Sequence, residues 1–214
     1  MRLTPLLLSL VAGCTAAAGA PGAAPTAAAG DTTRARDTAL QRELLERLRA
    51  DQAIRDTFVA RLQSGHPLDS LTVARMNAVD ASNTAWLKGV VVRSGWPTRA
   101  QVGAEGVDAA FLMVQHADLD TAFQARVLPE LERAASQGAL PWQQVALLTD
   151  RIAVHRGEPQ RYGTQASIVN GKIVFAPIAD SAHVDERRAR VGLPPLAVYA
   201  RVLDSVYTGQ PRKP

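Results

Sequence analysis

The chain has 214 residues, which is long enough for one domain with a proper hydrophobic core. Its formal net charge of +4 comes from basic residues that are scattered along the sequence and mostly interleaved with Asp and Glu. No basic patch alternates with aromatic side chains, so the composition argues against a nucleic-acid-binding protein. Aromatic residues form only 5% of the chain, and we therefore expect a core built from Leu, Val and Ala.

The first residues predict an exported lipoprotein. The short basic n-region Met1-Arg2 is followed by an apolar run from Leu3 to Gly13. This run is too short to cross a bilayer, which requires about 20 residues. The run ends in Leu10-Val11-Ala12-Gly13-Cys14, which resembles the lipobox of bacterial lipoproteins. Residues 1–13 are therefore predicted to be a lipoprotein signal peptide. Cys14, the only cysteine, is predicted to receive the lipid (palmitate or a related acyl chain) and to bind the bilayer. An ordinary signal peptide with an incidental cysteine is the alternative.

The predicted anchor sets an expected location and domain order. Thr15 follows Cys14, so the aspartate that often retains lipoproteins at the inner membrane is missing. In a diderm cell the expected location is the outer membrane, facing the periplasm. Residues 14–33 are predicted to be the lipidated Cys and a tether rich in Ala, Gly, Pro and Thr, without a large apolar side chain to bury. A single α-helical domain is expected over residues 34–208, and a frayed tail over residues 209–214.

The first half of the domain predicts helices. Apolar residues recur every three or four positions from Leu40 to Leu62, which predicts one long amphipathic helix or two in tandem, closed by Gly65. The stretch from 67 to 80 has no clear pattern. A further helix is expected from about Ser82 to Arg93, and Gly95-Trp96-Pro97 breaks it.

Cap signals divide the next segment. Thr98 with Gln101 is a candidate capping box, and a largely apolar helix is expected from Val107 to Gln115 after an interruption at Gly103. Asp120 is predicted to cap a helix over residues 121–137. Two prolines bear on the helices that follow: Pro129 is expected to kink or split that helix, and Pro141 suits the first turn of another that ends at His155.

The strongest local signal is a β-hairpin. Asn170-Gly171 lies between the runs 166–169 and 172–175, which predicts a two-residue type I′ turn. Short helices are expected over residues 181–191 and from 196 to about 206. The predicted fold class is therefore mainly α: a compact domain of about seven to eight helices with one inserted β-hairpin near residues 164–176.

Two polar runs stand out as a candidate site. Residues 160–165 place two amides, a phenol, a hydroxyl and a guanidinium around a glycine, and Gln115-His116-Ala117-Asp118 ends the apolar helix. Neither helix propensity nor core packing requires the run 160–165, whereas a histidine at the end of a buried helix, such as His116, is more often structural or helix-capping than catalytic. Asp51 and Arg55 are four residues apart on a helix, a spacing typical of a surface ion pair worth about 0.3–0.5 kcal/mol.

A series of short motifs runs through the domain: Asp51-Gln52 with Arg55; Asn83; Gly95-Trp96-Pro97-Thr98; Val102-Gly103; Gln115-His116-Ala117-Asp118; Phe123-Gln124; Leu148 with Asp150-Arg151; Gln160 with Tyr162-Gly163-Thr164-Gln165; Val184-Asp185 with Arg187-Arg188; and Gly192-Leu193 with Pro195-Leu196 and Tyr199. Taken together, these motifs resemble an uncharacterised bacterial family, domain of unknown function 6624. The resemblance extends from about Leu44 to Tyr199. The family supplies no activity, but its pattern adds Asp51, Gln52 and Arg55 to the candidate site residues.

The leading functional hypothesis is a polar pocket that binds a small envelope ligand such as a saccharide, a peptide or a peptidoglycan fragment. The alternative is a hydrolase-type enzyme with His116 as general base, oriented by Asp118, Asp51 or Asp150, in which water or Thr164 attacks. The predicted catalytic residues are His116 and Asp118. The predicted ligand-binding residues are Asp51, Gln52, Arg55, Trp96, Gln115, Gln124, Asp150, Arg151, Gln160, Tyr162, Thr164 and Gln165.

Two further possibilities bear on the same residues. The polar groups could instead form a buried network that joins the helices to the hairpin, in which Asp150-Arg151 caps open backbone groups. A metal site built from His116, Asp118 and Asp120 is disfavoured, because alternate residues share a face only in an extended segment and Asp120 is better explained as a helix cap. No metal or other cofactor is predicted, and the sequence leaves the oligomeric state open.

Overall fold

A computed structural model describes residues 35–66 and 69–208. The predicted signal peptide, Cys14, the tether and the tail 209–214 lie outside these ranges. The described residues form seven α-helices and one antiparallel two-stranded hairpin, which confirms the mainly α fold class. The elements are α1 (Thr38–Gln63), α2 (Ser70–Ser94), α3 (Arg99–Gln115), α4 (Thr121–Ser136), α5 (Trp142–His155), β1 (Ala166–Val169), β2 (Lys172–Phe175), the 3-10 turn η1 (Ser181–His183), α6 (Val184–Arg190) and α7 (Leu196–Thr208).

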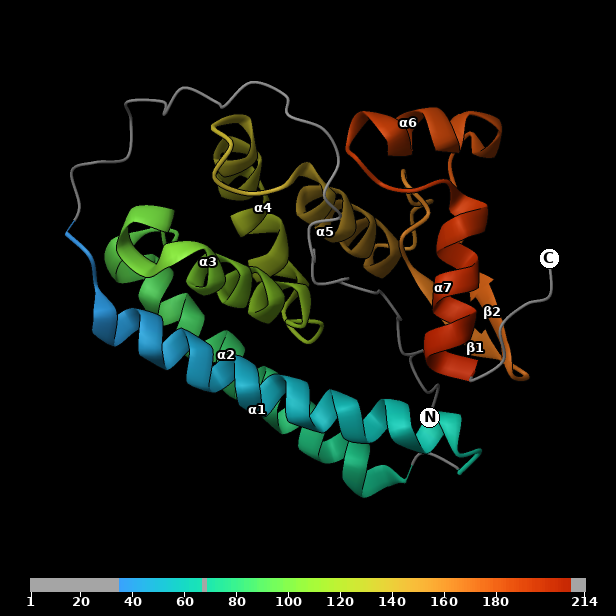
Figure 1. Ribbon diagram of the computed structural model, residues 1–214, viewed down its shortest axis with the longest axis horizontal. Helices are drawn as coiled ribbons and strands as arrows, with labels where there is room; N and C mark the ends of the chain where they lie inside the picture. The colour runs from blue at the N-terminus through green and yellow to red at the C-terminus, as the bar shows by residue number, and fades with distance from the viewer. Residues whose placement is uncertain (1–34, 67–68, 209–214) are drawn as a thin grey trace, which may run out of the picture.

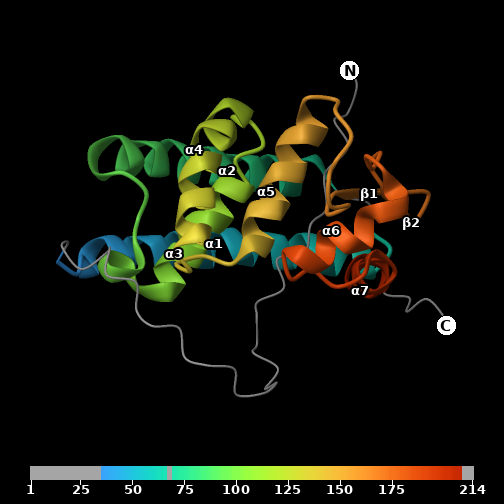
Figure 2. The ribbon, with the colours of Figure 1, turned by 90° about the horizontal axis from the view of Figure 1, so that it is seen from above.

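The helices are arranged around one long antiparallel pair. α1 and α2 run along one edge of the molecule, and α3 packs on α1 (Figure 1). α4 and α5 lie side by side, nearer to the viewer than α1 and α2 in Figure 2, and the hairpin, α6 and α7 form the other end of the domain (Figure 2). Because α1 contacts both α3 and α7, it links the two ends.

Two hydrophobic clusters make up the core. The larger cluster contains side chains from all five helices α1, α2, α3, α4 and α5. The smaller cluster joins α1 and α2 to the hairpin and α7. Leu44 of α1 belongs to the first cluster and Phe58 to the second. Asp51 lies midway between them, about two helical turns from each and therefore on the same face of α1. A carboxylate thus occupies a core-facing position where the two clusters meet.

Local signals placed most helix boundaries correctly. Thr98 and Gln101 form the predicted capping box, and Gly103 adopts a φ of 71° that bends α3, as expected. Asp120 caps α4 by accepting a hydrogen bond from the Phe123 N–H. α4 continues through Pro129, so the expected split does not occur.

Two further boundaries differ from the prediction. Pro141 is the N-cap of α5 and not part of its first turn. The segment expected as one helix over 181–191 divides into η1 and α6.

α2 is the largest correction, because it begins at Ser70 and not near Ser82. Asp69 caps it by accepting from the Thr72 N–H at 2.6 Å, and Thr72 and Met76 are buried. Tertiary packing of this first half against α1 and the hairpin end compensates for its weak apolar periodicity. The extra turns carry Asp80 into the centre of the molecule.

The hairpin forms as predicted. β1 pairs with β2 in the register Ala166↔Phe175 to Val169↔Lys172. Asn170 and Gly171 have φ values of 51° and 73°, the two positive values that a type I′ turn requires. Ala166 and Ile173 face the smaller hydrophobic cluster, which fixes the hairpin against α7.

Candidate functional site

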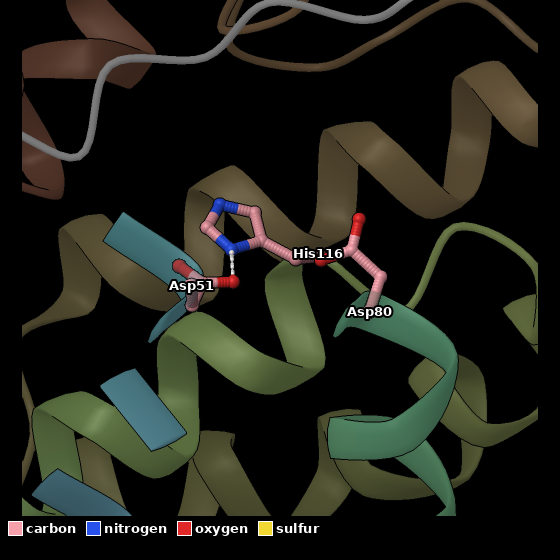
Figure 3. Close-up of side chains that lie close together, drawn as sticks. All are labelled: Asp51, Asp80 and His116. Carbon is pink, nitrogen blue, oxygen red and sulfur yellow. Dashed lines mark hydrogen bonds and ion pairs between the residues drawn. The ribbon is translucent and has the colours of Figure 1, made fainter. Parts of the chain in front are cut away.

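A histidine–aspartate pair lies where α1 meets the end of α3. His116 is the C-cap residue of α3, and its Nδ1 is 2.9 Å from Oδ1 of Asp51. Asp51 is fully buried, whereas the His116 side chain keeps 12% of its surface exposed. The second ring nitrogen, Nε2, points away from Asp51 (Figure 3). The imidazole is therefore bonded to a carboxylate on one edge and keeps a small part of its surface exposed.

Arg55 joins Asp51 to a second carboxylate, Asp80. Its Nη1 donates to Asp51 Oδ1 at 2.8 Å, and its Nη2 donates to both oxygens of Asp80 at 2.9 and 3.0 Å. Gln52 donates to the other oxygen of Asp51 at 2.7 Å. Asp51 is thus fixed by three side chains, and the surface ion pair that its spacing to Arg55 suggested is instead a buried one.

The environment favours a neutral imidazole beside an ionised carboxylate. Burial lowers the pKa of His116 below its ordinary value of about 6.5, and the charge of Arg55 lowers it further. Burial acts to raise the pKa of Asp51, but the hydrogen bond from His116 and the charge of Arg55 outweigh it, and the pKa lies below its ordinary value. Since a carboxylate only accepts hydrogen bonds, Nδ1 carries the imidazole proton and Nε2 presents a lone pair.

A second ion pair borders the histidine. Arg151 of α5 is almost completely buried and donates to both oxygens of Asp118 at 2.7 and 2.6 Å. Burial acts to raise the pKa of Asp118, but the charge of Arg151 overcomes it and the pKa is lowered. Gln124 donates to the Val114 carbonyl at 3.1 Å and is 3.4 Å from Asp118. Asp118 therefore holds Arg151 beside His116 and does not orient the imidazole itself.

Two more side chains join this second pair. Nε2 of His155, one turn after Arg151 on α5, lies 3.9 Å from Asp118. Burial raises the pKa of Tyr207 on α7, which is close enough to Arg151 and Arg55 to feel both charges. A neutral phenol therefore lies at the α7 side of the cluster.

Three potential metal ligands converge in this cluster. One ligand atom each from Asp51, Asp80 and His116 lies within 4.8 Å of the others. The guanidinium of Arg55 is bonded to both carboxylates, so an arginine supplies the positive charge between them. The group that converges includes neither Asp118 nor Asp120. Asp120 instead caps α4 and pairs with Lys88.

The run 160–165 forms a separate network around Asp150. This fully buried carboxylate accepts from the backbone N–H groups of Arg161 at 2.7 Å, Tyr162 at 3.0 Å and Thr164 at 2.9 Å, and from the Thr164 hydroxyl at 2.9 Å. Burial raises its pKa, an effect that these hydrogen bonds oppose. Asp150 therefore closes the loop that leads into the hairpin.

Gln160 and Gln165 complete this loop. The Gln160 amide donates to the carbonyls of Gln165 and Ala176 at 2.9 and 2.8 Å and accepts from the Gln165 N–H at 2.8 Å. Gln165 in turn donates to Thr164 Oγ1 at 2.9 Å. Because these side chains are fully buried and bind mainly protein backbone, their geometry favours a structural role, and the ligand-binding role expected for them stays a prediction.

Arg188 of α6 stabilises the same loop from the α6 side. The sequence did not indicate this role. Arg188 donates to the carbonyls of Tyr162 at 2.6 Å and Pro194 at 2.6 Å, and it lies 5.0 Å from the centre of the Tyr199 ring. Gly163 lies between these contacts with a φ of 68°. A Cβ there would lie 2.9 Å from Ile178, so the position requires glycine for both reasons.

The structure therefore divides the predicted site residues into three groups. Trp96 is apart from both polar clusters: it belongs to the larger hydrophobic cluster and lines a surface depression near the end of α2. Cys14 lies outside the described residues. Around His116 lie Asp51, Gln52, Arg55, Gln115, Asp118, Gln124 and Arg151, and in the loop network lie Asp150, Gln160, Tyr162, Thr164 and Gln165.

Sequence reasoning missed Asp80, His155 and Tyr207. Helical register could have found them, because each continues an apolar stripe. Asp80 is two turns before the buried Leu87, and Tyr207 follows the buried Leu203 by one turn. A polar residue in line with a buried stripe faces the interior, where it requires a partner.

Comparisons with known proteins place the chain in a family without assigning an activity. Among the described residues, no helix combines the length and the apolar character that a membrane crossing requires. No curated protein and no solved structure matches the chain. A model of a family of unknown function, DUF6624, matches residues 38–211, which is most of the chain. The protein therefore belongs to the DUF6624 family.

Proposed function

We propose that this protein is a hydrolase-type enzyme in which His116 is the general base and Asp51 its positioning residue. One observation carries the proposal: Nδ1 of His116 is bonded at 2.9 Å to a fully buried carboxylate, while the imidazole side chain keeps 12% of its surface exposed. Burial also lowers the pKa of His116, so the imidazole is neutral near pH 7 and its Nε2 can accept a proton.

The proposed reaction uses water. Nε2 of His116 removes a proton from a water molecule whose oxygen forms a bond to the electrophilic carbon of the substrate. The bond to the leaving group then breaks, and the imidazolium returns the proton to that group. Asp51 stabilises the transient imidazolium, as the carboxylate does in histidine–aspartate pairs generally.

We further propose that the substrate is a small saccharide or peptide of the cell envelope. The support comes from the sequence, which predicts a lipid anchor at Cys14 and a tether before the domain. The charge balance of the site agrees with a weakly charged substrate, since Arg55 and Arg151 are each paired with carboxylates. Cell fractionation of a Cys14→Ala chain tests the location, because continued membrane association would contradict anchoring through this residue.

The test of the catalytic proposal combines two variants with a histidine control. Purified full chain is assayed on chromogenic p-nitrophenyl esters and glycosides. His116→Gln removes the base. Asp51→Asn keeps the shape of the side chain, but its amide donates to Nδ1 and so moves the imidazole proton to Nε2. Each variant is expected to lower kcat/KM by about 10²–10⁴-fold. In the parent chain, kcat/KM is expected to rise with pH as His116 loses its proton, with a pKa below about 6.5.

His66→Gln is the matched control, because His66 is exposed and its side chain is hydrogen-bonded only to Ser64 among the described residues. It is expected to leave the rate unchanged. Equal rates in the parent chain and His116→Gln would overturn the proposal. The same assays with a chelator test the metal alternative: loss of activity on chelation would mean that Asp51, Asp80 and His116 act as ligands and not as a base with its positioning groups.

Binding without catalysis is the second candidate. It is favoured by the balanced cluster of amides, carboxylates and guanidiniums around His116, which suits the hydroxyls of a saccharide. A thermal-shift screen of the parent chain with envelope saccharides and peptides separates the two candidates. A ligand that raises the Tm of the parent chain without being converted favours binding over catalysis.

A further inference from the structure

A second cluster of functional groups lies where α5 begins, away from the proposed catalytic histidine. A surface depression there encloses about 270 Å³ and is lined by Trp142, Arg161, Tyr162, Arg187, Arg190 and Val191. Trp142 is the first residue of α5, Arg187 and Arg190 are in the last turn of α6, and Arg161 and Tyr162 are in the loop closed by Asp150. Three separate segments thus bring three guanidiniums and two aromatic rings together.

The charge of this depression is positive. No acidic side chain is among the described residues that line it. Arg187 pairs with Asp180, whose Oδ2 lies 3.4 Å from its Nη1 and which also pairs with His183. Arg161 and Arg190 are exposed and make no hydrogen bond or ion pair through their side chains with the described part of the chain. Two guanidiniums are thus available to an anion, and the third is only partly neutralised.

The arginines are also held in place to different degrees. Arg187 is fixed by hydrogen bonds from Nε to the Arg161 carbonyl at 2.9 Å and from Nη2 to the Asp180 carbonyl at 3.0 Å. Arg161 lies over the Tyr162 ring at 5.4 Å, and Asp150 fixes the backbone of both residues. The buried loop network therefore presents a prearranged surface and does more than connect α5 to the hairpin.

We propose that this depression binds a phosphoryl group carried by a sugar or a similar small ring. Guanidinium groups match the geometry of phosphate oxygens and bind them with charge-assisted hydrogen bonds. Trp142, which is 43% exposed, and Tyr162 offer ring faces on which an attached sugar stacks. The phosphoryl group has two possible sources, a soluble sugar phosphate and the headgroup of an anionic lipid. The site does not depend on His116 or on the reaction proposed for it.

Binding measurements on the full chain carrying Cys14→Ala test this proposal without interference from the lipid. Calorimetric titration with glucose 1-phosphate, inorganic phosphate and glucose separates the phosphoryl group from the ring. Co-sedimentation with vesicles of phosphatidylglycerol or phosphatidylcholine tests the lipid source. The test variant combines Arg161→Gln and Arg190→Gln, since neither side chain has a hydrogen-bond partner to lose within the described residues. Thermal unfolding checks that it folds.

Glucose 1-phosphate is expected to bind the parent chain, with affinity about tenfold or more lower in the double variant. Arg42→Gln, which removes a charge from an exposed position on α1, is expected to bind as the parent does. Binding of phosphatidylglycerol vesicles alone, lost in the double variant, would support the same site with a lipid headgroup as its ligand. The proposal is overturned if neither probe binds, or if Arg42→Gln weakens binding as much as the double variant.

Discussion

Two polar clusters share helix α5, and they differ in how their groups are satisfied. Asp150 and Arg151 are consecutive, yet Asp150 closes the loop before the hairpin while Arg151 pairs with Asp118 beside His116. In the loop cluster the carboxylate is surrounded by backbone donors and is fully buried. In the histidine cluster the imidazole is bonded on one edge and part of its surface remains exposed. Similar residue types therefore stabilise the fold in one place and, in the function proposed above, carry the chemistry in the other.

Among the predicted changes, removal of the Asp150 carboxylate is expected to have the largest effect on the free energy of unfolding. Asp150→Ala leaves three backbone N–H groups and the buried Thr164 hydroxyl without their acceptor. Each lost partner costs about 1–3 kcal/mol, so we expect the free energy of unfolding to fall by about 3 kcal/mol or more. Urea unfolding followed by circular dichroism measures the change. Asp56→Ala, at an exposed position of α1, is the control and is expected to be neutral within about 0.5 kcal/mol.

If Asp150→Ala does not fold, Asp150→Asn retains the shape and part of the acceptor capacity, and it is expected to fold with reduced stability. If either variant were as stable as the parent chain, the loop cluster would not have the structural role inferred for it.

Shortening Gln165 is expected to have a smaller effect. Its side-chain amide donates to Thr164 Oγ1 and to the Leu147 carbonyl, both of which are buried. Gln165→Ala should therefore lower the free energy of unfolding by about 1–3 kcal/mol, read from the shift in Tm and from urea unfolding. Gln137→Ala changes an exposed glutamine and serves for comparison. An unchanged Tm for Gln165→Ala would indicate that this side chain is available to a ligand.

The smallest expected effect is a pH dependence of the free energy of unfolding that comes from the histidine cluster. Because burial lowers the pKa of His116, the unfolded chain binds more protons just below pH 6.5, and the contribution of His116 to stability is lost as the pH falls from about 6.5 to the folded pKa. The slope is at most about 1.4 kcal/mol per pH unit for one group. His155 changes in the same direction, since burial lowers its pKa also.

Unfolding free energies of the parent chain and His116→Gln between pH 7.5 and 5.5 isolate this contribution, and the variant is expected to lose stability less steeply. His183→Gln gives the opposite control. The hydrogen bond to Asp180 raises the pKa of His183, so its small contribution disappears as the pH rises. An identical slope in the parent chain and His116→Gln would show that His116 is not held as a buried neutral imidazole.

The sequence by itself determined most of what depends on neighbouring residues. The Asn170-Gly171 turn, the Thr98–Gln101 capping box and the Asp120 cap each form within a few residues, so their signals are local and were predicted correctly. The mainly α fold follows from the same short-range periodicity.

Only the tertiary structure decided which polar residues share a site. His116 and Asp51 are 65 residues apart, and Arg55 reaches Asp80 across 25 residues on a helix whose first half the sequence pattern did not reveal. The sequence placed residues 160–165 beside His116 as one candidate site, whereas packing separates them into two clusters on either side of α5. The physical reason is that hydrophobic burial is not specific about partners. The side chains that meet at its centre are set by how all seven described helices pack together.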